Sequence, residues 1–286
     1  MYPARFDYEA PASVPEAIEI LSARGDGAKV LAGGQSLVPL LKLRFAAPEV
    51  LVDIGRIPGL TFVRRDDPVL SVGATTTHAQ VEASKTLSER CPVFTDAAAV
   101  IADPLVRNLG TIGGSIVHAD PAGDWSAVLL AVDAEARVTG SRGERTIRAE
   151  ELVLGPFTPA LEPDELLTEI HVSAPKVTTA YEKLMRRTGD FATVGVAVSL
   201  RVVDGRLEEP RVALTAVGPQ PFRSLNAEQT LAGAELNEDL FSQAADAAAT
   251  ECEPAEDARG SIPYKREMVR VHVRRALRRA VGRREE

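Results

Sequence analysis

Two glycine-rich turns hold the residues of this sequence best suited to chemistry. Residues 32–36 read AGGQS and residues 111–115 read TIGGS. Paired glycines remove the Cβ and permit positive φ, so consecutive N–H groups can point into one concavity and meet a bulky anion. The hydroxyls of Ser36, Thr111 and Ser115 can add donors. The pair of turns predicts a site for the diphosphate of a dinucleotide, although each one alone is at least as typical of a tight strand–helix turn.

Neither turn matches the two best-known nucleotide motifs. A Rossmann fingerprint requires GxGxxG after the first strand, and although Asp53 lies near the spacing expected of its acidic residue, the glycine pattern differs. No GxxxxGK[ST] is present, which excludes a P-loop. The predicted diphosphate site is therefore of another type.

Polar residues follow the second turn. Asp120 and Asp124 are acceptors suited to ribityl or ribose hydroxyls, and the alternative is that they cap turns and helices. His118 could tether a flavin covalently, but a lone histidine is more often structural. No Ser/His/Asp or paired-glutamate arrangement stands out, so no catalytic acid–base residue is predicted.

Helices and strands in alternation must position the first turn. Residues 13–16 (SVPE) combine a Ser cap, a proline in the first turn and a glutamate, which predicts a helix that Gly25 can end. A strand at residues 29–32 runs into the first turn, residues 37–44 form a short apolar and basic segment, and residues 50–54 predict a buried strand.

The rest of the chain is richer in β-structure. Further strands are predicted at residues 69–74, 136–139, 166–172, 194–203 and 211–217, and Asp204-Gly205 predicts a hairpin turn. Further helices are predicted at residues 77–84, 92–101, 126–130, 244–249 and 265–284. This order predicts an α+β protein of three subdomains, with boundaries at residues 1–57, 58–175 and 176–286.

Composition narrows the function classes. The 286 residues carry a formal net charge of −8, which argues against a nucleic-acid partner. No apolar run approaches the ~20 residues needed to span a bilayer, and the N-terminus has no signal core, so a cytoplasmic protein is predicted. The only cysteines, Cys91 and Cys252, are far apart. A zinc site or an iron–sulfur cluster within the chain is therefore not expected.

The C-terminal helix has two distinct stripes. Val269, Val273, Leu277 and Val281 recur every four residues beside a basic stripe of Arg270, Arg274 and Arg278. The pattern predicts an amphipathic packing helix. The second interpretation is a contact of the basic stripe with a membrane surface or another subunit, so a peripheral membrane position stays open.

Several motifs together resemble one protein family. Residues 32–44 (AGGQSLVPLLKLR) and residues 107–114 with Ala119-Asp120-Pro121 resemble the two signatures of the FAD-binding medium subunit of molybdenum hydroxylases. This group includes aerobic carbon monoxide dehydrogenase and the flavin domain of xanthine dehydrogenase. Residues 181–184 (YEKL) with 189–192 (GDFA), and residues 264–268 (YKREM), resemble later family motifs. The resemblance covers essentially the whole chain.

The resemblance implies a fold and a set of cofactor-binding residues. The fold would be an FAD-binding fold of the vanillyl-alcohol-oxidase (PCMH) type, with two α/β subdomains followed by a C-terminal domain of antiparallel strands and helices. Carried over position by position, the FAD-binding residues would be Lys29, Val30, Leu31, Ala32, Gly33, Gly34, Gln35, Ser36, Ile101, Thr111, Ile112, Gly113, Gly114, Ser115, Asp120, Asp124, Leu166 and Lys183. Ile101 and Leu166 would pack near the isoalloxazine ring, and Lys183 would approach its polar edge.

The resemblance also implies a function as an electron relay. Electrons would come from a molybdenum–pterin centre in a large subunit, through two 2Fe-2S clusters in a small subunit, to FAD in this chain and then to an external acceptor. The assembly would be a dimer of heterotrimers. Carbon monoxide dehydrogenases commonly carry His at the position of Gln35 and Tyr at the position of Phe191. These differences weaken the case for carbon monoxide as the substrate. A stand-alone flavin oxidase or dehydrogenase and a non-redox nucleotide-binding protein are the alternatives.

Overall fold

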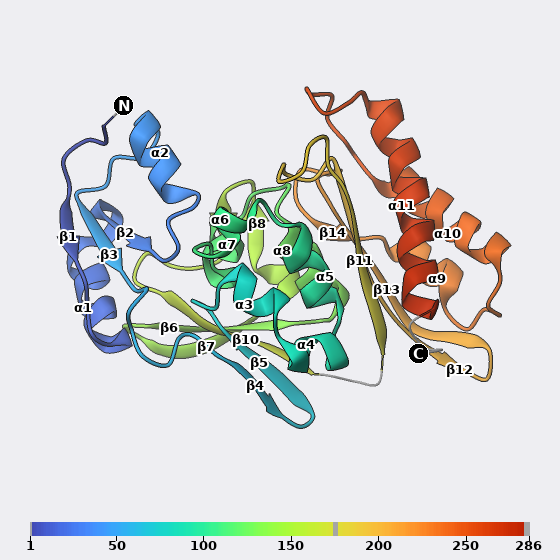
Figure 1. Cartoon of the computed structure of the whole chain (residues 1–286), viewed down its shortest axis with the longest axis horizontal. Helices are drawn as coiled ribbons and strands as arrows, with labels where there is room; N and C mark the ends of the chain where they lie inside the picture. Colours follow the sequence, from blue (N-terminus) through green and yellow to red (C-terminus); the bar gives the residue numbers. More distant parts are fainter. Residues whose placement is uncertain (1, 174–176, 283–286) are drawn as a thin grey trace.

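The computed structural model describes residues 2–173 and 177–282 and builds three units, each around its own sheet and apolar core. The units follow one another along the long axis of the molecule (Figure 1). This arrangement confirms the predicted α+β class. The predicted division into three subdomains stays a prediction. The expected boundary at residues 175 and 176 lies outside the described residues.

The N-terminal unit is a small parallel sheet with two helices. Its strands lie in the order β1 (Asp7–Glu9), β3 (Val50–Asp53) and β2 (Ala28–Leu31). Helix α1 (Val14–Arg24) begins as predicted, because the Ser13 hydroxyl accepts from the amide of Glu16; the 3-10 turn η1 (Gly25–Gly27) follows it. The apolar segment after the first glycine turn is a helix, α2 (Leu37–Leu43).

The central unit has a five-stranded antiparallel sheet. In spatial order its strands are β4 (Val63–Asp66), β5 (Val69–Gly73), β10 (Leu166–Ser173), β6 (Glu135–Gly140) and β7 (Gly143–Arg148). Its helices are α3 (His78–Glu82), α4 (Lys85–Arg90), α5 (Val93–Val100), α6 (Pro104–Arg107), α7 (Ile112–His118) and α8 (Asp124–Ala131). Short elements complete it: η2 (Ala149–Glu151), β8 (Val153–Gly155) and β9 (Thr158–Pro159).

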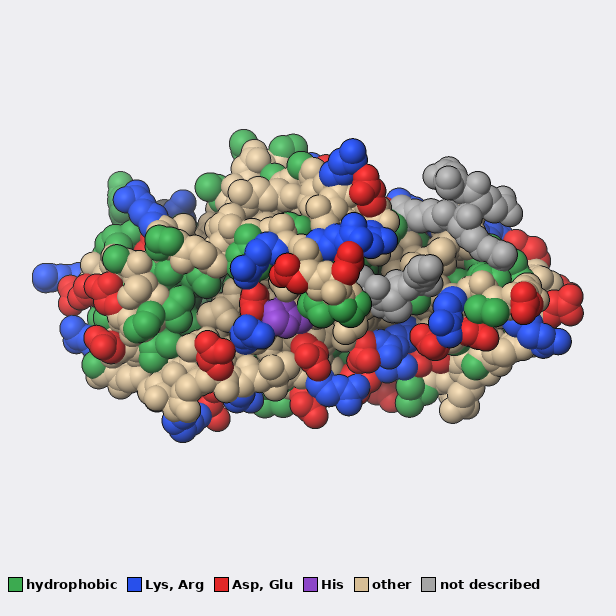
Figure 2. Space-filling view, turned by 90° about the horizontal axis from the view of Figure 1, so that it is seen from below, with side chains coloured by type: hydrophobic (Ala, Val, Ile, Leu, Met, Phe, Trp, Pro, Cys, Tyr) green, Lys and Arg blue, Asp and Glu red, His purple; other side chains and the backbone are tan. Residues whose placement is uncertain are grey.

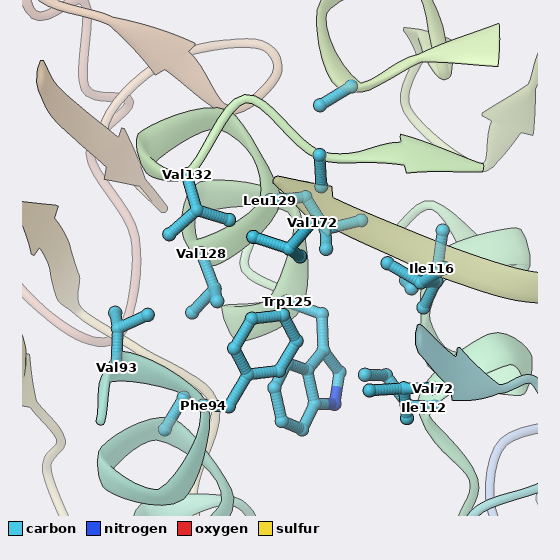
Figure 3. Close-up of a cluster of buried hydrophobic side chains, with 14 of the residues drawn as sticks. Val72, Val93, Phe94, Ile112, Ile116, Trp125, Val128, Leu129, Val132 and Val172 are labelled. Atoms are coloured by element: carbon cyan, nitrogen blue, oxygen red, sulfur yellow. The ribbon is translucent and has the colours of Figure 1, made fainter. Parts of the chain in front are cut away.

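The core of the central unit anchors the helix that follows the second glycine turn. Ile112 and Ile116 of α7 are buried and lie to one side of the Trp125 indole, which is tilted against Phe94 with ring centroids 5.8 Å apart (Figure 3). Burial of such aliphatic and aromatic side chains is worth about 1.5–3 kcal/mol each. Packing of these side chains in the core therefore fixes the position of the start of α7.

The C-terminal unit covers one face of a four-stranded antiparallel sheet with helices (Figure 1). Its strands are β11 (Thr178–Leu184), β12 (Val194–Val203), β13 (Arg206–Thr215) and β14 (Phe222–Arg223). Its helices are α9 (Leu225–Leu231), α10 (Glu238–Glu251) and α11 (Ile262–Gly282). The predicted hairpin is present, with positive φ at both Asp204 and Gly205.

The terminal helix packs as the sequence predicts. Val269, Val273 and Leu277 of α11 are fully buried against the sheet and α10. The basic stripe meets acidic residues of α10, since Arg270 pairs with Asp246 at 2.7 Å and Arg278 pairs with Glu238 at 2.6 Å. Residues 283 and 284 of the predicted helix lie outside the described residues. The packing interpretation is confirmed.

Charges of both signs are mixed over the face of the molecule seen in Figure 2, and no extended basic surface forms there. Across residues 2–173 and 177–282, none of the helices combines the length and the apolar character that crossing a bilayer requires.

Candidate functional site

The first glycine turn joins β2 to α2 and leaves backbone amides open. Gly34 has a φ of +71°, which glycine adopts without strain. The side-chain amide of Gln35 donates to the carbonyl of Gly33 at 3.1 Å and closes the turn. Within the described residues, the amides of Gly34, Gln35 and Ser36 donate to no acceptor, and the Ser36 hydroxyl also makes no hydrogen bond. The turn therefore offers a row of free donors to an anion.

The second glycine turn begins α7, and its amides already have acceptors. Three of them donate within the chain: Ile112 to the carbonyl of Thr76 at 3.0 Å, Gly113 to the carbonyl of Ala74 at 2.9 Å, and Gly114 to the hydroxyl of Thr111 at 3.1 Å. The expectation that both turns present free consecutive N–H groups is therefore wrong for this turn, because carbonyls of the loop after β5 accept from two of the amides and the Thr111 side chain accepts from the third. The Ser115 hydroxyl has no partner in the described parts of the chain and remains a free donor.

The fold brings the two turns into direct contact. A Cβ built on Gly33 would lie 2.0 Å from the carbonyl oxygen of Leu109, just before the second turn. A Cβ built on Gly114 would lie 3.7 Å from the Cβ of Ala32. Residues about 80 positions apart in the sequence thus form one surface, with open donors on one side and serine and threonine hydroxyls on the other. A diphosphate fits this set of donors.

The polar flank of the second turn is partly available. One oxygen of Asp120 accepts from the amide of Ala122 at 2.8 Å, and its other oxygen makes no hydrogen bond to a described residue. His118 is half-buried and its ring lies 5.2 Å from that of Phe157. Burial lowers the pKa of His118, and the charge of nearby Lys29 on β2 lowers it further against the opposing effect of Asp120. These contacts favour the structural interpretation of His118.

Both carboxylate oxygens of Asp124 accept hydrogen bonds from residues of the C-terminal unit. It is 5% exposed, and its two oxygens accept from the Tyr181 hydroxyl at 2.5 Å and from the Lys183 ammonium at 3.0 Å. Burial raises the pKa of Asp124, and the Lys183 charge opposes that shift. Burial and the Asp124 carboxylate raise the pKa of Tyr181, which therefore stays protonated and donates. A contact of Asp124 with a cofactor hydroxyl stays a prediction, and Asp120 is the more accessible of the two.

The other predicted residues are spread around the two turns. Val30 and Leu31 on β2 are half-buried, and Val30 packs against the N-terminal core. Ile101, at the end of α5, is 8% exposed. Leu166, at the start of β10, is 2% exposed and its side chain lies in the N-terminal core, so its contact with the flavin ring stays a prediction. Lys183 has a fully buried side chain.

Two residues outside the predicted cofactor-binding set make hydrogen bonds around the second turn. His78, at the start of α3, donates its amide to the carbonyl of Gly110 at 2.9 Å, and its ring accepts from the Trp125 indole at 3.2 Å. Burial lowers the pKa of His78 to about 4. Arg107 bonds to the carbonyls of Ile101 and Ala102 at 3.2 Å each. Arg107 stood within the second motif, and only the fold reveals its partners.

A hollow of about 260 Å³ lies elsewhere, among residues that include Val69, His171 and Arg211. It contains none of the predicted cofactor-binding residues. Its lining pairs basic with acidic side chains, as in the 2.8 Å contact of Arg211 with Asp133. The candidate site is instead the open surface formed where the two glycine turns meet.

The fold is that of a flavoprotein in which an FAD-binding domain is followed by a C-terminal domain of antiparallel strands and helices. Residues 4–175 match the family model of the FAD-binding domain in molybdopterin dehydrogenase, and residues 179–280 match that of the CO dehydrogenase flavoprotein C-terminal domain. The chain belongs to the family of FAD-binding medium subunits of molybdenum hydroxylases, of the carbon monoxide dehydrogenase and xanthine dehydrogenase type. It is thus an oxidoreductase flavoprotein subunit.

Individual relatives agree over nearly their full length. The chain is 44% identical to the carbon monoxide dehydrogenase medium chain of Hydrogenophaga pseudoflava, over 97% of each chain. It is 39% identical to subunit alpha of the 6-hydroxypseudooxynicotine dehydrogenase complex of Paenarthrobacter nicotinovorans, over 99% of this chain and 97% of that one. Among solved structures, quinoline 2-oxidoreductase from Pseudomonas putida 86 superposes with a TM-score of 0.94 at 31% identity, covering 99% of each chain.

Proposed function

We propose that this chain holds FAD non-covalently across its two glycine turns and relays electrons from iron–sulfur clusters of a partner subunit to an external acceptor. The observation that carries the proposal is the contact of Gly33 with Leu109, which joins the open donors of the first turn to the hydroxyls of the second. FAD supplies the redox chemistry when bound, and the protein supplies binding, orientation and electrostatics.

The residues of the site divide the binding task. The amides of Gly34, Gln35 and Ser36 would donate to the diphosphate from one side, and the Ser115 hydroxyl from the other. The free oxygen of Asp120 would accept from a ribityl or ribose hydroxyl. The family membership of the chain supports this assignment, and the tilted ring contact of His118 with Phe157 favours non-covalent binding.

The same membership supports a heteromeric enzyme. Solved structures of similar chains include a Cu,Mo-containing carbon monoxide dehydrogenase, and a carbon monoxide dehydrogenase from Hydrogenophaga pseudoflava that lacks the Mo-pyranopterin moiety of the molybdenum cofactor. By this analogy a large subunit would hold the molybdenum–pterin centre, a small subunit would hold two 2Fe-2S clusters, and the whole would form a dimer of heterotrimers in the cytoplasm. Within the described residues, no cluster of His, Cys, Asp or Glu could hold a metal in this chain.

Purification tests the proposal directly. The full chain should bind FAD on reconstitution, ADP should compete for the diphosphate site, and the native complex should bring down molybdenum and iron in other chains. A protein that binds neither FAD nor ADP would overturn the proposal. Turnover of a substrate by the isolated chain would instead favour a stand-alone flavin oxidase or dehydrogenase.

A further inference from the structure

The hollow of about 260 Å³ lies between the central and C-terminal units, away from the two glycine turns. Its walls include His171 of β10 and Arg148 at the end of β7, both from the central unit. Ser199 of β12 and Arg211 of β13 line it from the C-terminal unit. The hollow thus brings charged and polar side chains of two units around a space that suits a small ionised molecule.

The C-terminal wall places a cation beside an unbonded hydroxyl. Ser199 and Arg211 lie opposite each other on β12 and β13, and the neighbouring pair of Ala197 and Ala213 is buried in the core of the central unit. Because residues two apart on a strand share a face, Ser199 and Arg211 also face the central unit. Ser199 is 5% exposed, and its hydroxyl makes no hydrogen bond to a described residue. Such a hydroxyl is costly unless a molecule in the hollow bonds to it.

The central wall places a carboxylate between two side chains that can donate. His171, Glu135 and Arg148 lie opposite one another across β10, β6 and β7. Their neighbours in the chain are buried in the core on the other face of the sheet: Ile170, Ala136 and Ile147. The alternation of a strand therefore directs the three polar side chains away from that core, on the side of the hollow.

Three arginines line the hollow, and each has donors to spare: Arg90, Arg148 and Arg211. Arg148 and Arg211 pair with the two oxygens of Asp133 at 3.4 and 2.8 Å, each through one terminal nitrogen. Arg90 pairs in the same way with Asp67 at 3.3 Å. Among the described residues, the other nitrogens of these guanidinium groups have no acceptor. A guanidinium offers five N–H donors in a planar fork, which suits an oxyanion.

One carboxylate of the lining remains free to accept a hydrogen bond. Asp133 is shared by two arginines, and Glu209 pairs with Arg201 at 2.9 Å. Glu135, whose side chain is exposed at the rim, forms no ion pair in the described parts of the chain. An ionised carboxylate accepts from an oxyanion that carries a hydroxyl and repels one that carries none. The lining therefore favours an oxyanion with a hydrogen of its own.

We propose that this hollow binds a small oxyanion that also carries a hydroxyl donor, of which hydrogenphosphate is the simplest. The guanidinium groups of Arg148 and Arg211 and the Ser199 hydroxyl bind its anionic oxygens, and Glu135 accepts from its hydroxyl. Sulfate has a similar shape and charge but no hydrogen to donate, so Glu135 selects against it. The same chemistry is offered by a phosphate monoester with a hydroxyl close to its phosphate.

Titration calorimetry on the full chain saturated with FAD tests the site, because FAD then fills the glycine turns. At neutral pH and constant ionic strength, phosphate should bind at least tenfold more tightly than sulfate. Arg148→Gln and Arg211→Gln should each weaken phosphate binding at least tenfold. Glu135→Gln should bring the affinities for phosphate and sulfate to within about twofold of each other. Arg270→Gln, which loses a surface pair with Asp246, is the matched control and should change neither affinity.

Glycerol 3-phosphate distinguishes the two sources of the ligand. Tighter binding of phosphate than of glycerol 3-phosphate would identify the free ion, and the reverse would identify a phosphorylated small molecule. Binding of neither, or equal binding of phosphate and sulfate by the unaltered chain, would overturn the proposal. Phosphate binding that survives both arginine substitutions would also overturn it.

The design allows for a variant that fails to fold. If Arg211→Gln unfolds because Asp133 loses its partner in the C-terminal unit, Arg148→Gln decides the question, since the Arg148 side chain is 54% exposed. The result is separable from the proposed function. A chain that binds no FAD can still be titrated with phosphate, and the arginine variants then show whether the ion binds in the hollow.

Discussion

Gly33 lies so close to Leu109 that a Cβ on the glycine would fall 2.0 Å from the Leu109 carbonyl oxygen. This contact joins the N-terminal unit to the central unit at the point where both contribute to the candidate site. The glycine is required for packing between the two turns as well as for access of a ligand. A substitution there tests the joint between the units and FAD binding together.

Gly33→Ala should push the two turns apart. We expect a loss of about 1–3 kcal/mol in the free energy of unfolding, as for overpacked sites, together with loss of FAD after purification. Thermal unfolding and flavin content measure the two effects. Gly155→Ala is the matched control, because nothing lies within 4 Å of a Cβ built on Gly155. Equal behaviour of the two variants would contradict the packing role.

Ser115→Ala should weaken FAD binding without affecting the fold. A hydrogen bond to a charged group contributes about 1.5–3 kcal/mol, so we expect at least a tenfold rise in the Kd for FAD. The melting temperature of the apoprotein should stay the same, since the hydroxyl has no partner among the described residues. Titration calorimetry gives the Kd, and Ser242→Ala on the surface of α10 serves as control. An unchanged Kd would remove Ser115 from the site.

His78 should make stability depend on pH in the acid range. Its pKa is about 4 in the folded protein against 6.5 for the free side chain, so the unfolded chain binds more protons between these values. Stability is therefore lost as the pH falls from 6.5 to 4, by on the order of 3 kcal/mol. Urea unfolding of the unaltered chain and of His78→Gln over this range should show the difference between them shrinking or reversing at low pH. Parallel pH curves would be incompatible with a neutral buried His78.

Asp124→Asn should destabilise the junction of α8 with β11. Removal of one partner from a buried ion pair costs about 3–5 kcal/mol, because the Lys183 ammonium is left without its carboxylate. The double variant Asp124→Asn with Lys183→Met should be more stable than Asp124→Asn alone, since no buried charge then remains unpaired. Denaturant unfolding of all four proteins forms a double-mutant cycle. Additive effects would show that the pair does not couple.

Local signals in the sequence were enough for much of the fold. The Ser13 cap, the Asp204-Gly205 turn and the four-residue spacing of Val269, Val273 and Leu277 each act over a few residues, and the structure has the helix, hairpin and packing face that they predict. The predicted helix at residues 77–84 is shorter in the structure: α3 ends at Glu82, and Ser84 caps a separate helix, α4, that was not predicted. Boundaries depend on such competition between neighbouring caps.

The sequence was enough to predict which residues form the candidate site, but not which hydrogen bonds they make within the chain. The glycine pairs and hydroxyls are visible in the sequence, but the acceptors of the second turn, Ala74 and Thr76, come from a loop almost 40 residues earlier. Asp124 is on helix α8, and its partner Lys183 lies 59 residues away on strand β11 of the C-terminal sheet. Such pairings depend on tertiary packing, so no local pattern could reveal that Asp124 is committed to Lys183.

The two turns differ in whether their backbone amides already have acceptors within the chain, and this difference bears on when FAD can bind. The amides that start α7 find acceptors in the chain itself, so this half of the site is complete as soon as the central unit folds. The amides of Gly34 to Ser36 have no acceptor among the described residues, so a bound anion would be their first acceptor other than water. We therefore expect FAD to load onto the chain after it has folded, and apoprotein stored without flavin to take up FAD when the cofactor is added.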